Sequence, residues 1–290
     1  MKVLNSLPPY NLFGIEEQDY AKARVVVLPV PYDSTSTYRT GSREGPHAII
    51  EASRNMELYS EELDRDISEI GVYTLEELAP DFGSPKGMVD RIAREVTLIL
   101  EDSKVPLLIG GEHTIAIGSV KAVTAFHKDF SVLHFDAHAD SRDELNSTKY
   151  CHACVMARIR EMCGSCYSVG VRSTDRKSHK ENMGSVLYME EIEDLRIDDI
   201  VERISKSTKK KLYITFDLDV LDTGIMPNTG TPEPGGMGFN QVCRILRRVL
   251  SDKELIGMDF SELCPIPGLT APNFLAAKLI YLTIGYAFRR

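Results

Sequence analysis

The sequence predicts one α/β domain in which helices cover both faces of a mostly parallel sheet. Two features of the 290 residues carry this prediction. First, β-branched runs alternate with helical stretches, and the runs are continuously apolar, as strands buried on both faces are. Second, no Pro/Gly/Ser-rich linker divides the chain and no segment is repeated. We therefore expect a single three-layer α/β/α domain that spans residues 1–290.

The first half of the chain contains three expected strands and three expected helices. A helix is expected where apolar residues recur every three or four positions, and a strand where a short β-branched run is continuously apolar. The expected strands are 24–30, 106–109 and 131–135, and the expected helices are 45–53, 87–102 and 114–127.

The second half continues this alternation. The expected strands are 167–171, 186–189, 212–216 and 255–260, and the expected helices are 154–162, 198–207, 240–250 and 274–288. The last helix is the most apolar segment of the chain, but it is short and contains Lys278. We therefore expect it to pack on the core and not to span a membrane.

Composition narrows the class of protein. The net charge of −9 and the lack of a Lys/Arg-rich block argue against a nucleic-acid-binding protein. Residues 1–10 contain no long apolar stretch, so we expect no signal peptide and a cytoplasmic location. An acidic chain is compatible with a small cationic substrate.

Six cysteines include two C-x-x-C pairs, Cys151 with Cys154 and Cys163 with Cys166. Such pairs are typical of structural zinc sites. However, the residues between the pairs are predicted to be helical, and a helix rising ~1.5 Å per residue would keep the two pairs apart. We therefore expect reduced, partly buried thiols, with a zinc knuckle and a Cys163–Cys166 disulfide as alternatives.

Acidic residues follow two of the predicted strands directly. One strand is followed by Asp136, His138 and Asp140, and another by Asp217 and Asp219. If the chain stays extended, residues two positions apart share a face, so each group should project to one side. Carboxylates are seldom buried without a cationic partner. In doubly covered parallel sheets, ligands bind at the carboxyl ends of the strands. The pattern therefore predicts a metal centre there.

His113 is a further candidate ligand. It belongs to the motif GGEHT at residues 110–114, which follows a predicted strand and begins a predicted helix. The glycines permit a tight turn and a close approach of the backbone. His134 lies inside a predicted strand and is expected to be a hydrogen-bonded core residue.

The candidate ligands comprise two imidazoles, four carboxylates and no thiolate. Such an oxygen-rich set favours Mn²⁺ over Zn²⁺, with Fe²⁺, Co²⁺ and Mg²⁺ as rivals. Four aspartates balance two divalent ions, and a bridging hydroxide would leave about one net negative charge. A guanidinium substrate would suit that charge.

Several long motifs in the correct order resemble the ureohydrolase family, which includes arginase and agmatinase. The matching segments are 39–46 (RTGSREGP), 110–114 (GGEHT), 136–140 (DAHAD), 215–222 (TFDLDVLD) and 228–236 (NTGTPEPGG). The resemblance runs nearly from end to end. It implies an arginase-like fold and a hydrolase with two Mn²⁺ ions per subunit.

The resemblance also implies a ligand set. Asp136 and Asp217 would bridge the ions, and metal-bound hydroxide, oriented in part by Asp140, would attack the guanidinium carbon. The residues that would hold one ion are His113, Asp136, Asp140 and Asp217, and those that would hold the other are Asp136, His138, Asp217 and Asp219.

Two further positions match catalytic residues of the family. His152 corresponds to a proton-shuttle histidine that would help protonate the leaving amine. Glu262 corresponds to a glutamate that binds the guanidinium. The alternative interpretations are an exposed loop histidine and a solvated acid at a strand end. Some positions depart from the family pattern: Glu112 stands where Asp is more usual, and Cys154 stands where Ser or Thr is more usual.

The motifs and length resemble agmatinases more than arginases, which predicts hydrolysis of agmatine to putrescine and urea. Asp143 and Glu144 are candidate partners for a terminal ammonium, and the alternative interpretation is that both are solvated. Arg142 would instead bind the carboxylate of a guanidino or formimino acid, so an arginase or a related acid hydrolase is an alternative. A catalytically inactive metal-binding interaction protein is an alternative of another class. Relatives imply a homo-oligomer, a trimer or hexamer.

Overall fold

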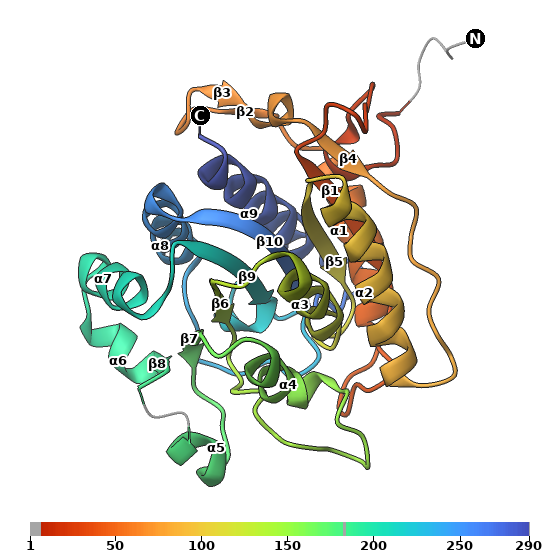
Figure 1. Ribbon diagram of the computed structural model, residues 1–290. Coiled ribbons are helices and arrows are strands. Elements are labelled where there is room, and N and C mark those ends of the chain that lie inside the picture. The colour runs from red at the N-terminus through yellow and green to blue at the C-terminus, as the bar shows by residue number, and fades with distance from the viewer. Residues whose placement is uncertain (1–6, 182–183, 290) are drawn as a thin grey trace.

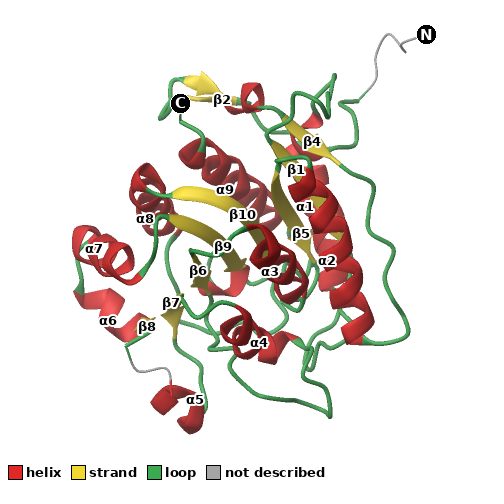
Figure 2. Ribbon diagram, in the orientation of Figure 1, coloured by secondary structure: helices red, strands yellow, loops and turns green. Residues whose placement is uncertain are grey.

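The computed structural model describes residues 7–181 and 184–289. Its centre is an eight-stranded sheet with the strand order β4-β1-β5-β10-β9-β6-β7-β8, and all seven neighbouring pairs are parallel. Helices pack on both faces of this sheet, as Figures 1 and 2 show. The structure confirms the predicted α/β class with its three layers.

The strands of the sheet agree with the expected ones to within one or two residues at most ends. Their bounds are β1 Val25–Val30, β4 Val72–Thr74, β5 Val105–Gly110, β6 Phe130–Phe135, β7 Cys166–Val171, β8 Val186–Tyr188, β9 Lys211–Asp217 and β10 Glu254–Ser261. The sequence did not predict β4 or a separate antiparallel pair, β2 Tyr59–Ser60 with β3 Arg65–Asp66. These segments are short, so they carry little periodic signal.

The helices also follow the predicted order. Their bounds are α1 Gly45–Ser53, α2 Pro85–Glu101, α3 Ile115–Phe126, α4 Val155–Met162, α5 Arg176–Glu181, α6 Met189–Asp194, α7 Ile197–Ser207, α8 Phe239–Asp252 and α9 Ala271–Ala287. The six-residue helices α5 and α6 were not predicted. The last helix begins at Ala271, before the expected start, because Pro272 occupies a first-turn position where its missing N–H has no cost.

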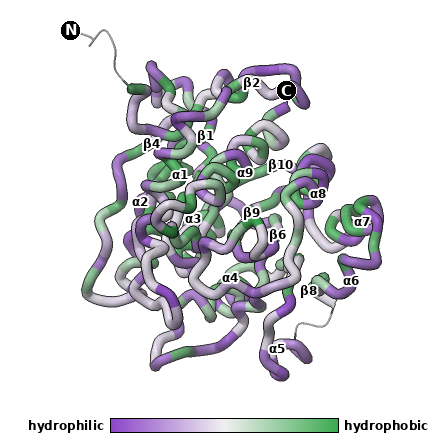
Figure 3. The backbone as a smooth tube through the Cα atoms, turned by 180° about the vertical axis from the view of Figure 1, so that it is seen from behind, coloured by the Kyte–Doolittle hydropathy of each residue, from purple (hydrophilic) through white to green (hydrophobic). Residues whose placement is uncertain are grey.

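The core consists of two apolar layers separated by the sheet. Side chains of α1, α7, α8 and α9 pack in one layer, and side chains of α2, α3 and α4 pack in the other. Strands such as β1 and β6 are buried at every position, which explains their unbroken apolar character. In Figure 3 the hydrophobic segments lie mainly inside and the hydrophilic ones mainly in outer loops.

The last helix, α9, belongs to this core. Its buried residues occur all around the helix axis, as expected for a helix covered on most sides. Among residues 7–181 and 184–289, no helix has the length and apolarity needed to cross a membrane.

The sheet brings distant parts of the sequence together at one edge. The four central strands, β5, β10, β9 and β6, are mutually parallel neighbours, so their carboxyl ends meet at the same edge. The loops that leave these four ends carry the acidic motifs singled out in the sequence.

Candidate metal centre and substrate cavity

All six predicted ligands converge at the carboxyl edge of the central strands. His113 follows β5 at the start of α3, and its position depends on two glycines. A Cβ atom at Gly111 would lie 2.2 Å from the carbonyl oxygen of Tyr32, so no other residue fits this turn. The remaining ligands follow β6 and β9; they are Asp136, His138, Asp140, Asp217 and Asp219.

His113 is the centre of the first ligand group. Its Nδ1 atom lies 3.1 Å from Asp140 Oδ2, 3.2 Å from Asp136 Oδ2 and 3.5 Å from Asp217 Oδ2. His113 and Asp136 are fully buried, and Asp217 is nearly so. Three carboxylate oxygens around one imidazole nitrogen form a set that a divalent cation would fit.

His138 is the centre of the second group. Its Nδ1 atom lies 2.8 Å from Asp219 Oδ2 and 3.6 Å from Asp136 Oδ1. The two oxygens of Asp136 therefore face different groups, Oδ2 toward His113 and Oδ1 toward His138. This is the geometry expected of a carboxylate shared by two ions.

Asp217 shows only part of the expected bridging geometry. Its Oδ2 atom faces His113, whereas its Oδ1 atom accepts a hydrogen bond from the Asp219 amide nitrogen at 2.9 Å. Residues Leu218–Val220 form a 3-10 turn, so the assumption of an extended chain was wrong here. The turn, not strand alternation, brings the Asp219 carboxylate to the centre.

The extended path after β6 also ends early. Asp140 has a left-handed backbone with φ of 44°, and Glu262 after β10 has φ of 69°. Residues other than glycine rarely adopt this region, and doing so costs ~1–2 kcal/mol. Such strained positions cluster at functional sites because the surrounding structure holds a side chain where the backbone alone would not.

The side chains around the buried aspartates do not supply enough positive charge to balance all of their carboxylates. Burial raises the pKa of Asp217 well above its ordinary value, and the nearby carboxylates of Asp219 and Asp136 raise it further. Burial would also raise the pKa of Asp136, but the surrounding imidazoles of His134, His113 and His138 hold it well below its ordinary value. A cation at this point would compensate the cluster, so the donor set fits metal ions.

His134 was predicted to be a hydrogen-bonded core residue, and the structure confirms this. It is fully buried, with Nδ1 3.0 Å from Ser168 Oγ and Nε2 2.7 Å from Asp136 Oδ2. Its link to Asp136 was missed, although the spacing of two residues along a strand places both side chains on one face. His134 therefore orients a candidate metal ligand.

A second buried chain of hydrogen bonds orients His113. Thr215 Oγ1 donates to Asp259 Oδ1 at 2.8 Å, so it can accept a hydrogen from His113 Nε2, also at 2.8 Å. Nδ1 of His113 then keeps its lone pair for a metal. Tyr213 donates to the other Asp259 oxygen at 2.7 Å. The sequence alone did not reveal Asp259, because its role depends on its register opposite Thr215 in the next strand.

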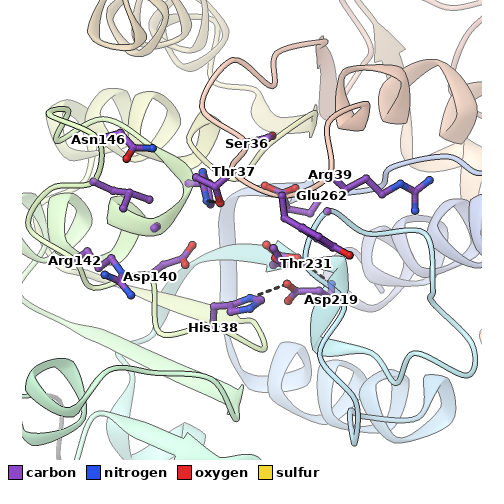
Figure 4. Close-up of a pocket in the computed structure, with 16 residues that line it drawn as sticks. Ser36, Thr37, Arg39, His138, Asp140, Arg142, Asn146, Asp219, Thr231 and Glu262 are labelled. Carbon is purple, nitrogen blue, oxygen red and sulfur yellow. Dashed lines mark hydrogen bonds and ion pairs between the residues drawn. The ribbon is translucent and has the colours of Figure 1, made fainter.

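A cavity of about 440 Å³ lies over these groups. Figure 4 shows its lining residues, with Asp140, His138, Asp219 and Glu262 around a common space and the Arg39 side chain extending away from them. The cavity floor consists of buried or half-buried residues, namely His138, Asp140, Asp217, Asp219 and Glu262. The cavity rim consists of exposed loop residues, namely Thr37, Tyr38, Arg142 and Asn146.

Both predicted catalytic residues line this cavity. Glu262 Oε1 accepts a hydrogen bond from the His113 amide nitrogen at 2.7 Å. Burial and the nearby Glu112 raise the pKa of Glu262 well above its ordinary value, so a bound cation would favour its ionised form. The half-buried His152 lies within hydrogen-bond distance of Thr35 and Thr37.

The two acids suggested for ammonium binding do not line the cavity. Asp143 is exposed and pairs with Lys149 and Arg158, and Glu144 is exposed as well. The structure therefore favours the alternative interpretation, in which both acids are solvated. Arg142, the alternative carboxylate partner, is part of the rim beside Asp140.

The cysteines do not form one cluster. Cys151 and Cys154 lie before α4, with their sulfur atoms 3.2 Å apart, whereas Cys163 and Cys166 lie after it. All six cysteines are free thiols. No group of three or more metal-binding side chains in the described ranges includes a cysteine. The structure thus favours reduced thiols over a zinc knuckle.

Comparisons with known proteins agree with this geometry. The sequence profile described as the Arginase family matches residues 23–285. The chain is 37% identical to N(1)-aminopropylagmatine ureohydrolase of Synechocystis sp. over 276 residues, which cover 92% of this chain and 90% of that protein. It is 33% identical to agmatinase of Pyrococcus horikoshii over 287 residues, covering 97% and 98%. The crystal structure of agmatine ureohydrolase of Thermoplasma volcanium matches with a TM-score of 0.88 at 29% identity, covering 99% and 96%.

Proposed function

Because the chain belongs to the arginase family and is a ureohydrolase acting on guanidino compounds, we propose that it hydrolyses agmatine to putrescine and urea. The family resemblance and arginase-like fold expected from the motifs are confirmed by these matches. The relatives named agmatinase support agmatine as the substrate. The observation that carries the proposal is the orientation of the Asp136 carboxylate, whose two oxygens face two separate groups of ligands.

We propose two Mn²⁺ ions as the cofactor. The donors are carboxylate oxygens and imidazole nitrogens without thiolate, a set that suits Mn²⁺. When bound, the two ions would lower the pKa of a shared water and so supply a hydroxide nucleophile near neutral pH. The residues that would hold the ions are His113, Asp136, Asp140 and Asp217 for one, and Asp136, His138, Asp217 and Asp219 for the other.

The remaining chemistry falls to three side chains. Glu262 uses one oxygen to accept from His113, which leaves the other for the N–H groups of a guanidinium. Asp140 lies at the floor, where it would accept a hydrogen bond from the attacking water. His152 would donate a proton to the departing amine, because an unprotonated amine is a poor leaving group.

N(1)-aminopropylagmatine is a second candidate substrate. Four relatives that carry this name are 34–37% identical to the chain, compared with 30–33% for four agmatinases. The reacting guanidinium is the same in both compounds. The contacts of the longer polyamine would differ from those of agmatine only where its tail meets the exposed rim residues.

A urea-release assay with Mn²⁺ tests the proposal. We expect turnover of agmatine, or of N(1)-aminopropylagmatine, to exceed turnover of arginine and 4-guanidinobutyrate. Preference for arginine or 4-guanidinobutyrate would overturn the substrate assignment. Two bound metal ions without urea from any of the four compounds would identify an inactive metal-binding homologue. Metal analysis of the same sample, with chelated protein as the control, shows whether a lack of urea release comes from missing metal or from an inactive, metal-loaded protein.

We also propose that the protein acts in the cytoplasm as a homo-oligomer, a trimer or hexamer. Light scattering on the purified protein would give its mass directly. A monomeric mass at micromolar concentration would contradict this assembly.

A further inference from the structure

A buried glutamate connects the loop before α1 with the turn that carries His152. Glu112 is fully buried, and its two oxygens accept hydrogen bonds from four donors of three residues, the weakest being the Ser36 hydroxyl at 3.5 Å from Oε2. The amide nitrogen of Thr35 donates to Oε2 at 2.7 Å, and the Thr35 and Thr114 hydroxyls each donate to Oε1 at 2.7 Å. Such a convergence of donors suits a carboxylate, which can only accept.

The next contact of Thr35 is the imidazole of His152. The single hydroxyl hydrogen of Thr35 is used toward Glu112, so its oxygen can only accept from other groups. His152 Nδ1 lies 3.2 Å from that oxygen, and the His152 amide nitrogen donates to it at the same distance. Nδ1 must then carry a hydrogen, which leaves Nε2 as the nitrogen free to exchange a proton.

We propose that Glu112 and Thr35 are positioning residues that fix the tautomer and ring orientation of His152. This inference rests on the proposed function, in which His152 protonates the leaving amine. Only the tautomer with hydrogen on Nδ1 presents Nε2 to the substrate as the exchanging nitrogen. Nε2 has Thr37 Oγ1 at 3.4 Å, a contact on the exposed rim. In a catalytic triad, a carboxylate orients a histidine by a direct hydrogen bond. In this protein the Thr35 hydroxyl would stand between the carboxylate of Glu112 and the histidine.

A structural role alone would have different consequences. Thr35 also anchors its loop through its backbone nitrogen, a contact that any residue at this position retains. The loop supplies Thr37 and Tyr38 to the rim, so loosening it would raise KM. Loss of the hydroxyl from an intact loop should instead lower kcat, because only the proton transfer changes.

Thr35→Val removes the hydroxyl at nearly constant volume, and Thr35→Ser retains it. We expect Thr35→Val to lower kcat about tenfold to a hundredfold with KM and metal content little changed, a range typical of impaired proton transfer. Thr35→Ser should remain within about threefold of the unmodified protein. Thr124→Val, at a half-buried position near the end of α3, is the matched control and should change neither constant.

A double-mutant cycle separates the two interpretations. If Thr35 acts through His152, then Thr35→Val should cause no further loss in a His152→Ala background. Additive losses would overturn the proposal. So would a Thr35→Val effect confined to KM.

Nitrogen-15 NMR of the imidazole gives a readout that does not depend on urea release. We expect hydrogen on Nδ1 of neutral His152 in the unmodified protein and a shift toward the Nε2 tautomer in Thr35→Val. Glu112→Gln gives a second test, since its amide would donate to Thr35 and reverse the hydrogen bond to His152. A dominant Nε2 tautomer in the unmodified protein would overturn the relay even if the enzyme is active. The expected tautomer without any ureohydrolase activity would instead refute the proposed function alone.

Discussion

The floor and the rim of the cavity are held in place by different parts of the fold. Floor residues follow the ends of β6, β9 and β10 at the centre of the sheet, and most are buried. Rim residues come from two exposed loops, and Tyr38 is 79% exposed. The sheet therefore fixes the reacting groups rigidly, whereas the loops are free to differ among proteins with the same chemistry. This division predicts large effects on turnover from the floor and its supports, and small effects on substrate choice from the rim.

Asp136→Asn should have the largest effect. The amide lacks the negative charge that both ligand groups use, so we expect loss of metal and a fall in turnover on the order of 1000-fold or more. Metal analysis and the urea assay measure the two quantities on one sample. Asp129→Asn, an exposed acid paired with Lys209, is the control and should behave as the unmodified protein. Two bound ions with full activity in Asp136→Asn would refute the assignment.

His152→Ala should have the next largest effect. We expect about a 100-fold lower kcat with unchanged metal content, because the residue would supply a proton and not a metal ligand. Added imidazole should restore part of the rate, as a free acid replaces the missing one. An unchanged kcat would remove His152 from the reaction.

Asp259 links the floor to pH-dependent stability. Burial raises the pKa of Asp259 to about 6, above the value of ~3.9 in an unfolded chain. The folded state therefore binds the Asp259 proton more tightly than the unfolded state does. The stabilisation that comes from this protonation is present below about pH 4 and is lost as pH rises to about 6. The full change is roughly 3 kcal/mol, since each pKa unit corresponds to about 1.4 kcal/mol.

Asp259→Asn removes this titration. We expect the free energy of unfolding of the unmodified protein to fall, relative to that of the variant, by roughly 3 kcal/mol between pH 4 and pH 6. Urea unfolding of the metal-free proteins measures this difference. The pH-independent offset between the two proteins reports the lost hydrogen bonds to Tyr213 and Thr215. A constant difference across this range would show that Asp259 does not titrate there.

Arg142→Ala tests the rim and should have the smallest effect. The direction of the change in KM reports the charge of the substrate tail. With agmatine, loss of an exposed cation beside the cavity should lower KM by about twofold to fivefold. With 4-guanidinobutyrate the same change should raise KM. A raised KM for agmatine would mean that Arg142 does not repel the ammonium tail. A kcat loss comparable to that of His152→Ala would contradict the division between floor and rim.

The floor could be predicted from sequence, and the rim could not. Asp136, His138 and Asp140 follow an apolar strand within five residues, so local order alone places them at a strand end. The rim depends on how loops fold back: Arg142 lines the cavity whereas the neighbouring Asp143 and Glu144 do not, and no local pattern encodes this difference. The support of His152 by Thr35 joins positions 117 residues apart, so only the folded chain reveals it.

The left-handed backbone at Asp140 and Glu262 has a consequence for how the protein would evolve. Glycine adopts this conformation without strain, so Asp140→Gly or Glu262→Gly relieves the backbone while deleting a carboxylate from a crowded acidic cluster. A library selected for thermostability alone should therefore enrich glycine at both positions and yield sturdier, inactive proteins. Selection for urea release should remove the same substitutions. The two positions mark where the fold and the chemistry favour different residues.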